Sequence, residues 1–289
     1  MEEKELNRSF YIGSEWLYYK IYIGNNTANT FLRAFNRVIT PLLDEKIVEN
    51  FFFIRYADPD SHLRIRFKVR KMEHLSVIIK MMYELTTSFF NNHSIYKIQT
   101  DTYNREIERY GKNTMEDSEK LFYIDSKIIL AQLSDNEDIN EIDIWFKALK
   151  IIDMYLDVFD FSLEEKALFI KKLADGFSKE FPTNRLGKKQ LALKYRTNRL
   201  KIEQVLKEKL DDILIQNRDI LRLVAQKIMK KTNFERGIIE SLLSSYLHMH
   251  CNRFFSNKQR MNEWLLYDFL SIYYKSEISR LKTKTVNNE

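Results

Sequence analysis

The segment His62–Arg70 carries the most informative side chains of this 289-residue sequence. A β-strand places alternate side chains on opposite faces. Here one face would carry only apolar residues, while the other would carry His62, Arg64, Arg66, Lys68 and Arg70. Cations two positions apart on a strand lie about 7 Å apart and repel one another unless anions lie between them. The pattern indicates a site for an anionic group, or a solvated face whose charges pair with Asp and Glu of neighbouring helices.

A second group of charges occupies Tyr103–Gly111, for which we expect a helix over residues 103–110. Glu106 and Arg109 would then be neighbours on one helical face, because residues three apart meet there. Gly111 is expected to end the helix, since glycine is common just past a helix C-terminus. Taken alone, this cluster is explained by ordinary ion pairing at a surface.

A third group lies on the helix expected around Ser241–Arg253. One stripe of that helix carries Ser241, Ser244, Ser245, His248 and Asn252. Small residues beside a histidine leave room for a ligand or let another element approach closely. Imidazole titrates near neutral pH, so His248 is a candidate acid or base, although a partly buried structural histidine explains it too. His250 faces another way and no H-E-x-x-H motif occurs, so no metal site is predicted.

Strand-like and helix-like segments alternate over the first hundred residues. Strands are expected at 16–23, 51–56, 62–69 and 95–102, and helices at 27–43 and 72–90. The order β-α-β-β-α-β is that of a ferredoxin-like unit. Both helices of such a unit cover one face of the sheet, so the basic side of the strand at 62–69 stays open.

After residue 102 the pattern is helical throughout. Helices are expected at 103–110, 116–134, 141–158, 162–180, 187–231 with a break, 234–256 and 258–281. The predicted fold class is therefore α+β, an N-terminal ferredoxin-like βαββαβ sheet unit followed by a large, mainly helical part. We expect one domain over residues 1–289, with a sheet subregion at 10–102 and a helical subregion at 103–281.

Composition excludes several classes of protein. With 6 Gly and 3 Pro, turn-rich β folds are disfavoured, and no glycine-rich phosphate loop occurs. The single Cys251 excludes an intramolecular disulfide. No apolar run suits a membrane span, and the acidic start resembles no secretory signal, so the cytoplasm is expected. A net charge of +6 is compatible with an anionic partner without requiring nucleic acid.

Four motifs occur in a specific order along the chain. They are Gly13–Tyr18; Phe53–Pro59 running into His62–Phe67; Tyr103-x-x-Glu106-x-x-Arg109-Tyr110-Gly111; and His248-Met249-x-x-Asn252-Arg253. Together they resemble the elimination domain of class I lanthipeptide dehydratases, also called the thiopeptide-type bacteriocin biosynthesis domain. The resemblance extends from about residue 10 to residue 281 and lacks the family's glutamylation domain, which implies a stand-alone or split elimination protein.

The resemblance implies a lyase of antibiotic biosynthesis. In the family, glutamate from glutamyl-tRNA is esterified to Ser or Thr of a precursor peptide, and its elimination leaves dehydroalanine or dehydrobutyrine. The family's essential residues match Arg64, Arg66, Glu106, Arg109 and His248. Four more residues of the motifs are expected to bind substrate: His62, Tyr103, Asn252 and Arg253. Some relatives form pyridine rings and lack the charged set, so its presence favours elimination; Lys112 departs from the family's second glycine and affects only the loop.

The residue types agree with that reaction. Arginines can bind the glutamyl carboxylate and stabilise a developing enolate, but they stay protonated and are poor bases. Glu106 and His248 are both candidates for the base. No cofactor is expected, because the reaction involves no redox step. We further expect the five catalytic candidates to converge in one cleft between the sheet and the helical part.

The expected partners are a glutamylated precursor peptide and a separate glutamylation-domain protein, with a homodimer left open. No direct nucleic-acid role is expected. An RNA-binding protein remains an alternative, because an open sheet face with aromatic and basic residues also suits RNA, yet residues 57–70 lack the Gly-aromatic spacing of the RNA-recognition motif. A non-catalytic partner subunit is the other alternative.

Overall fold

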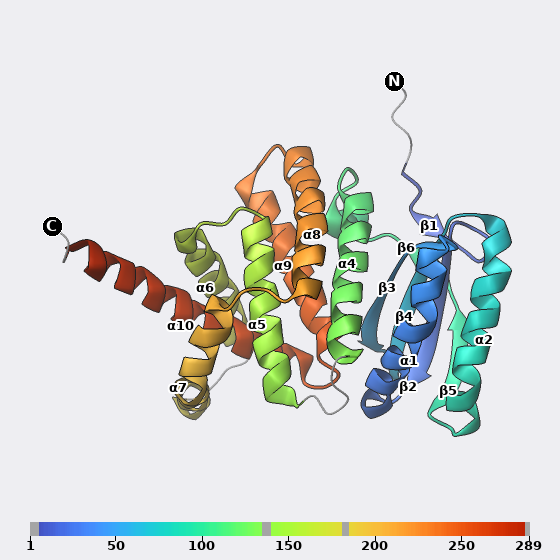
Figure 1. Cartoon of the computed structure of the whole chain (residues 1–289), viewed down its shortest axis with the longest axis horizontal. Coiled ribbons are helices and arrows are strands. Elements are labelled where there is room, and N and C mark those ends of the chain that lie inside the picture. The colour runs from blue at the N-terminus through green and yellow to red at the C-terminus, as the bar shows by residue number, and fades with distance from the viewer. Residues whose placement is uncertain (1–5, 135–139, 181–184, 287–289) are drawn as a thin grey trace. The chain divides into compact units, whose positions relative to one another are not determined.

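The computed structural model describes residues 6–134, 140–180 and 185–286, and the chain divides into two compact units (Figure 1). Unit 1 comprises residues 1–138 with 230–234, and unit 2 comprises residues 139–229 with 235–289. Unit 1 contains the sheet and is larger than the predicted sheet subregion, because it also includes the first long helix after residue 102. The prediction of a single domain over the whole chain stays a prediction.

An antiparallel four-stranded sheet forms the centre of unit 1. Its strands are β2 (Trp16–Ile23), β3 (Val48–Ala57), β4 (Ser61–Val69) and β5 (Ile95–Thr100). Two helices join them, α1 (Asn25–Asp44) and α2 (Leu75–Asn91), the latter preceded by a 3-10 turn η1 (Met72–His74). The spatial order β3-β4-β2-β5 confirms the predicted ferredoxin-like unit, because chain order βαββαβ with the first strand beside the third and fourth defines that fold.

Helices α1 and α2 cover the apolar face of this sheet. Phe35 of α1 packs against Phe51 and Phe67, and Phe31 packs against Phe89 of α2. Phe67 and its alternate neighbours on β4 are buried, as a period of two residues requires. The basic residues of β4 consequently lie on the opposite face, as the sequence predicts. The prediction that this face stays open is wrong, because Tyr103 of the later strand and neighbouring rings pack over it, which leaves His62 and Arg66 only 3% and 8% exposed.

Helix α4 (Met115–Ser134) covers the outer edge of β3 (Figure 1). The Phe53 amide donates a hydrogen bond of 3.3 Å to the Ser126 hydroxyl, and the Phe52 ring packs edge-on against Phe122. An edge strand otherwise presents unpaired backbone groups that invite association. Helix α4 therefore both protects this edge and fixes β3 against β4.

The helix predicted over residues 103–110 is wrong in its first half. Tyr103–Asn104 forms strand β6, which pairs with β1 (Ser9–Phe10), and only Ile107–Tyr110 is helical, as α3. Pairing with a strand near the N-terminus overrides the local helical pattern. The predicted end of the helix is confirmed, since Gly111 has φ +76° and its amide donates to the Ile107 carbonyl.

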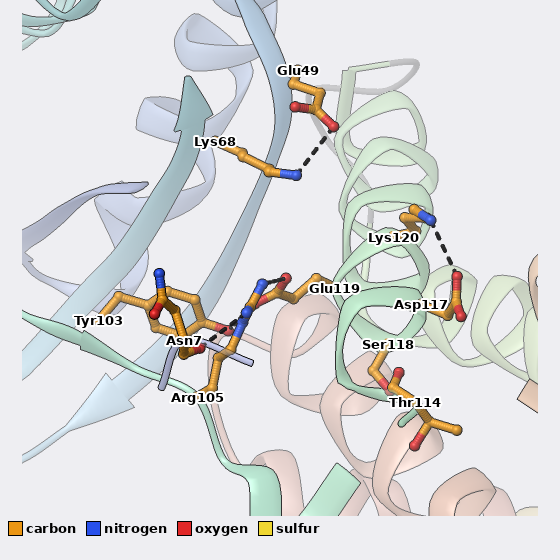
Figure 2. A network of polar contacts seen from close by, with 10 residues as sticks. All are labelled: Asn7, Glu49, Lys68, Tyr103, Arg105, Thr114, Asp117, Ser118, Glu119 and Lys120. Atoms are coloured by element: carbon orange, nitrogen blue, oxygen red, sulfur yellow. Dashed lines mark hydrogen bonds and ion pairs between the residues drawn. The ribbon is translucent and has the colours of Figure 1, made fainter. Parts of the chain in front are cut away.

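A buried ion pair holds β6 against α4 (Figure 2). Arg105 donates from Nε and Nη2 to the two carboxylate oxygens of Glu119, each at 2.7 Å, and from Nη1 to the Asn7 carbonyl at 3.0 Å. The Tyr103 hydroxyl donates to the same carboxylate at 2.8 Å. Because Arg105 and Glu119 are each only 3% exposed, the bidentate geometry is what makes their burial tolerable.

Six helices make up the described part of unit 2. They are α5 (Glu141–Val158), α6 (Leu163–Glu180), α7 (Arg185–Lys207), α8 (Asp212–Lys231, which ends at the boundary with unit 1), α9 (Arg236–Phe254) and α10 (Gln259–Val286). The predicted break within 187–231 lies between α7 and α8. The start of α6 is a reciprocal cap, in which the Ser162 amide donates to Glu165 and the Glu165 amide donates to the Ser162 hydroxyl.

These elements confirm the α+β class. A small antiparallel sheet unit comes first and a mainly helical part follows. Within the described ranges, no helix is both long and apolar enough to cross a membrane.

We predict that Arg105→Met lowers the free energy of unfolding by about 3–5 kcal/mol, because it leaves the Glu119 carboxylate buried without its cation. The double variant Arg105→Met/Glu119→Leu should recover most of this loss, since it removes both charges. Urea denaturation of the single and double variants measures the difference. Equal losses in both would show that the packing of the arginine stem, rather than the charge pair, stabilises this region.

Candidate functional site

Arg66 lies on the face of the sheet opposite to α1 and α2, inside an aromatic cage made by Tyr18, Phe52 and Tyr103. Its guanidinium carbon is 4.4 Å from the ring centre of Tyr18, 5.2 Å from that of Phe52 and 4.8 Å from that of Tyr103. Tyr18 and Phe52 are its direct neighbours in register on the flanking strands. Arg66 is 8% exposed, so the ring faces replace water as the surroundings of this cation.

Arg64, two positions away on β4, is held from two sides. Its guanidinium stacks 3.5 Å from the centre of the Tyr56 ring, and its Nε donates to His62 Nε2 at 3.0 Å. His62 donates from Nδ1 to the Asp60 carbonyl at 2.8 Å, and its ring stacks on Tyr22. Burial lowers the pKa of His62, which keeps the ring neutral and able to accept from Arg64.

Neither arginine has a carboxylate partner among the residues that the structure describes. The neighbouring lysines of the same face do have carboxylate partners. Lys68 pairs with Glu49 at 3.2 Å (Figure 2), and Lys20 pairs with Asp101. Of the two explanations for the basic strand, ion pairing therefore accounts for Lys68 but not for Arg64 or Arg66. Binding of an anionic group by these two arginines stays a prediction, and Arg66 is nearly inaccessible in this structure.

In the same unit, Glu106 directly precedes the short helix α3 and Arg109 lies within it. Arg109 Nη1 lies 3.6 Å from Glu106 Oε2, which confirms the predicted pairing. The Glu106 side chain is 61% exposed, so its carboxylate is accessible. Burial lowers the pKa of Arg66 and the charge of Glu106 opposes that shift, so Glu106 acts electrostatically on the caged arginine.

His62 and Tyr103, expected to bind substrate, already have their polar atoms bonded within unit 1. Both ring nitrogens of His62 are occupied, and the Tyr103 hydroxyl donates to Glu119. They are 3% and 4% exposed. The contacts make them supports for Arg64 and Arg66, while direct substrate binding by either residue stays a prediction.

In unit 2, His248 is oriented by a carboxylate that the sequence analysis missed. Its Nδ1 lies 2.9 Å from Glu263 Oε2, a buried side chain on the next helix, α10. Glu263 also accepts from Gln259 Nε2 at 2.7 Å and from the Tyr267 hydroxyl at 3.0 Å. Burial raises the pKa of Tyr267, so this hydroxyl remains a donor. Because Nδ1 is engaged, proton transfer by His248, which stays a prediction, would use Nε2.

The remaining candidates of unit 2 lie on α9, where the predicted stripe of small residues is confirmed as the less buried side of the helix. Asn252 is half-buried on this stripe with His248, whereas Arg253 is 1% exposed and enclosed within the helical packing. Substrate binding by Asn252 and Arg253 stays a prediction. The expected convergence of His248 with the arginines of unit 1 also stays a prediction.

The structure also bears on two other expectations, namely RNA binding by this face of the sheet and the absence of a metal site. Bases of RNA stack on accessible aromatic rings. Here Trp16, Tyr18 and Tyr22 are only 1%, 3% and 6% exposed, whereas Tyr56, which stacks on Arg64 of the same face, is 41% exposed, so RNA binding stays an alternative. Among the described residues, no group of three His, Cys, Asp or Glu side chains is placed to hold a metal ion. The absence of a cofactor stays a prediction.

Residues 16–274 match the protein family described as lantibiotic biosynthesis dehydratase, C-terminal. The nisin biosynthesis protein NisB of Lactococcus lactis subsp. lactis is 28% identical over 267 residues, which are 91% of this chain and 26% of NisB. The subtilin biosynthesis protein SpaB of Bacillus subtilis is 25% identical over 260 residues, 87% of this chain and 25% of SpaB. The chain thus spans about a quarter of the length of these relatives.

Solved structures show the same fold at lower identity. The tRNA-dependent lantibiotic dehydratase MibB from Microbispora sp. 107891 superposes with a TM-score of 0.69 at 19% identity, over 96% of this chain and 29% of MibB. The pyridine synthase TbtD of thiomuracin biosynthesis superposes with a TM-score of 0.64 at 10% identity, over 91% of this chain and 99% of TbtD.

We predict that the support of Arg64 by His62 is sensitive to acid. Because burial lowers the pKa of His62 in the folded chain, the unfolded chain binds this proton more readily. The neutral His62 ring therefore contributes to the free energy of unfolding above the unfolded pKa of about 6.5, and this contribution is lost as the pH falls below that value. The variant His62→Gln, whose amide can both donate to Asp60 and accept from Arg64, should lose this part of the pH dependence. Thermal unfolding from pH 7.5 to 5 of both proteins measures it; parallel curves would contradict the assignment.

A second prediction concerns the tautomer of His248. Glu263→Gln replaces the accepting carboxylate by an amide, so the Nδ1-protonated tautomer should lose population. Side-chain ¹⁵N NMR of the imidazole ring measures the two tautomers. His74, whose Nδ1 lies 3.1 Å from the Ile47 carbonyl, serves as the control resonance that should not change. An unchanged His248 spectrum would show that Glu263 does not orient the ring.

Proposed function

The chain belongs to the lantibiotic biosynthesis dehydratase C-terminal family, and we propose that it eliminates glutamate from glutamylated Ser or Thr residues of a ribosomal precursor peptide. The products would be dehydroalanine and dehydrobutyrine, which makes the protein a lyase. One observation supports this most strongly: Arg64 and Arg66 are held on a rigid sheet without a carboxylate partner among the described residues. Such arginines suit a substrate that carries one carboxylate and releases another.

The reaction breaks two bonds and forms one π bond. A base takes the Cα proton, the Cβ–oxygen bond breaks, and glutamate departs as a carboxylate. Negative charge grows on the peptide carbonyl oxygen and on the departing ester oxygens. Arg64 and Arg66 are fixed in advance by Tyr56, His62 and the aromatic cage, so as a pair they can hold the glutamyl carboxylate and stabilise this developing charge without reorganising first.

Two groups are candidates for the base. Glu106 has an exposed carboxylate whose charge acts on Arg66, and Arg109 beside it can steer an anionic substrate. His248 is oriented by Glu263 and presents Nε2, which suits it to take the Cα proton or to protonate the leaving group. Arginine itself stays protonated and serves neither role.

The proposed partners follow from the reaction. A glutamylated precursor peptide is the substrate, and a glutamylation-domain protein that esterifies its Ser and Thr residues is the proposed second partner. Such a process belongs in the cytoplasm, where aminoacylated tRNA is made. TbtD is a pyridine synthase with the same fold, so fold alone does not select the reaction. The charged set at Arg64, Arg66, Glu106 and Arg109 favours elimination.

We predict that Arg66→Lys slows glutamate release about a hundredfold, because lysine keeps the charge but loses the planar fork that orients two hydrogen bonds. The probe is a synthetic peptide with one serine esterified by glutamate, followed by mass spectrometry under single-turnover conditions. Lys68→Gln is the matched control on the same strand and face, since Lys68 is already paired with Glu49.

The wild-type chain should convert the probe to its dehydroalanine form. Circular dichroism should show that the Arg66 variant keeps its fold. A near-normal rate for this variant would remove Arg66 from the catalytic assignment. Hydrolysis of the ester back to serine by the wild-type chain would contradict elimination itself.

A further inference from the structure

The aromatic cage holds hydrogen-bond donors that no described residue satisfies. The Tyr18 hydroxyl, the Arg66 Nε and the nearby Trp16 Nε1 are all buried and have no hydrogen-bond partner within the described ranges. A buried polar group without a partner costs about 1–3 kcal/mol, so native proteins keep few of them. Three at adjoining positions of one sheet face indicate that an acceptor from outside the chain belongs there.

Tyr18 is placed to share a ligand with Arg66. The two residues are directly opposite each other in register on β2 and β4, and the guanidinium carbon lies 4.4 Å from the ring centre. Trp16 is two positions before Tyr18 on the same face and packs against Phe52 and Tyr103. The unsatisfied donors therefore belong to one cluster.

The protonation state of Tyr18 suits a donor. Burial raises the pKa of its hydroxyl, although the charges of Arg66, Arg64 and Lys20 act to lower it. The net shift is upward, so the phenol keeps its proton at neutral pH. A neutral hydroxyl beside a permanent cation can donate to an anion without adding charge to the site.

We propose that Tyr18 is a further catalytic residue, whose hydroxyl donates a hydrogen bond to the free carboxylate of the substrate's glutamyl group while Arg66 supplies the charge. This rests on the proposed function, because the elimination reaction is what supplies a glutamyl group. A carboxylate fits better than a carbonyl oxygen, since a permanent buried cation is neutralised only by a permanent anion. Its two oxygens match the two donors, the Tyr18 hydroxyl and Arg66 Nε.

The variant Tyr18→Phe tests this, because it keeps the ring against Arg66 and removes only the hydroxyl. We expect binding of free L-glutamate, measured by calorimetry, to weaken about 10- to 100-fold, as the loss of a hydrogen bond to a charged group implies. Glutamate release from the synthetic peptide should slow by a similar factor. The thermal midpoint should stay the same or rise, since an unsatisfied buried hydroxyl is removed.

Tyr19→Phe is the matched control. Tyr19 is the next residue on β2, is also buried, and packs against Phe67 on the opposite face of the sheet. Its hydroxyl should matter neither for glutamate binding nor for glutamate release. Weakening of glutamate binding in both variants alike would overturn the specific role of Tyr18.

The outcomes separate this inference from the proposed function. Glutamate binding that depends on Tyr18, in a chain that releases no glutamate from the peptide, supports the carboxylate site and removes the elimination activity. Normal release and normal glutamate affinity in Tyr18→Phe overturn the inference and leave the elimination activity intact. No glutamate binding by the wild-type chain also overturns it, as does a lower thermal midpoint with unchanged affinity, which would mean that the hydroxyl only bonds water.

Discussion

The enclosure of Arg66 by aromatic rings instead of a carboxylate is the interaction on which the rest of unit 1 depends. Ring faces stabilise a cation only partly, so the guanidinium keeps most of its capacity to attract an anion. The cage needs three neighbouring elements at once, since Tyr18, Phe52 and Tyr103 come from β2, β3 and β6. Helix α4 along β3 and the Arg105–Glu119 pair beside β6 hold those elements in place.

Arg105 and Arg66 show how one residue type serves two purposes in one unit. Both are nearly inaccessible, at 3% and 8% exposed. Arg105 donates two hydrogen bonds to the Glu119 carboxylate, so its charge is neutralised and its role is structural. A third arginine, Arg55, donates to Asn29, and burial lowers its pKa to about 10. Arg66 differs from Arg105 in having no carboxylate partner among the described residues, so burial alone does not distinguish a structural arginine from a candidate binding residue.

The sequence predicts those features that are written in local periodicity. Alternation in β4 places the basic residues on one face, although not its burial; the spacing on α9 gives the stripe around His248, and Ser162 gives the start of α6. Features set by distant partners escape it. Tyr103–Asn104 forms a strand because Ser9–Phe10 lies beside it, and Glu263 orients His248 from the following helix. No local pattern encodes either contact, nor the rings that converge on Arg66.

Carboxylate binding by Arg66 is tested most directly by side-chain NMR of the arginine Nε–H groups during titration with L-glutamate. We expect the Arg66 Nε–H resonance to shift in a saturable manner, because this donor is buried and without an acceptor in the described residues. The Arg105 Nε–H resonance should stay still, since it already donates to Glu119 at 2.7 Å. If the Arg66 Nε–H resonance does not shift, or if both resonances shift together, Arg66 does not bind a carboxylate and the central claim is contradicted.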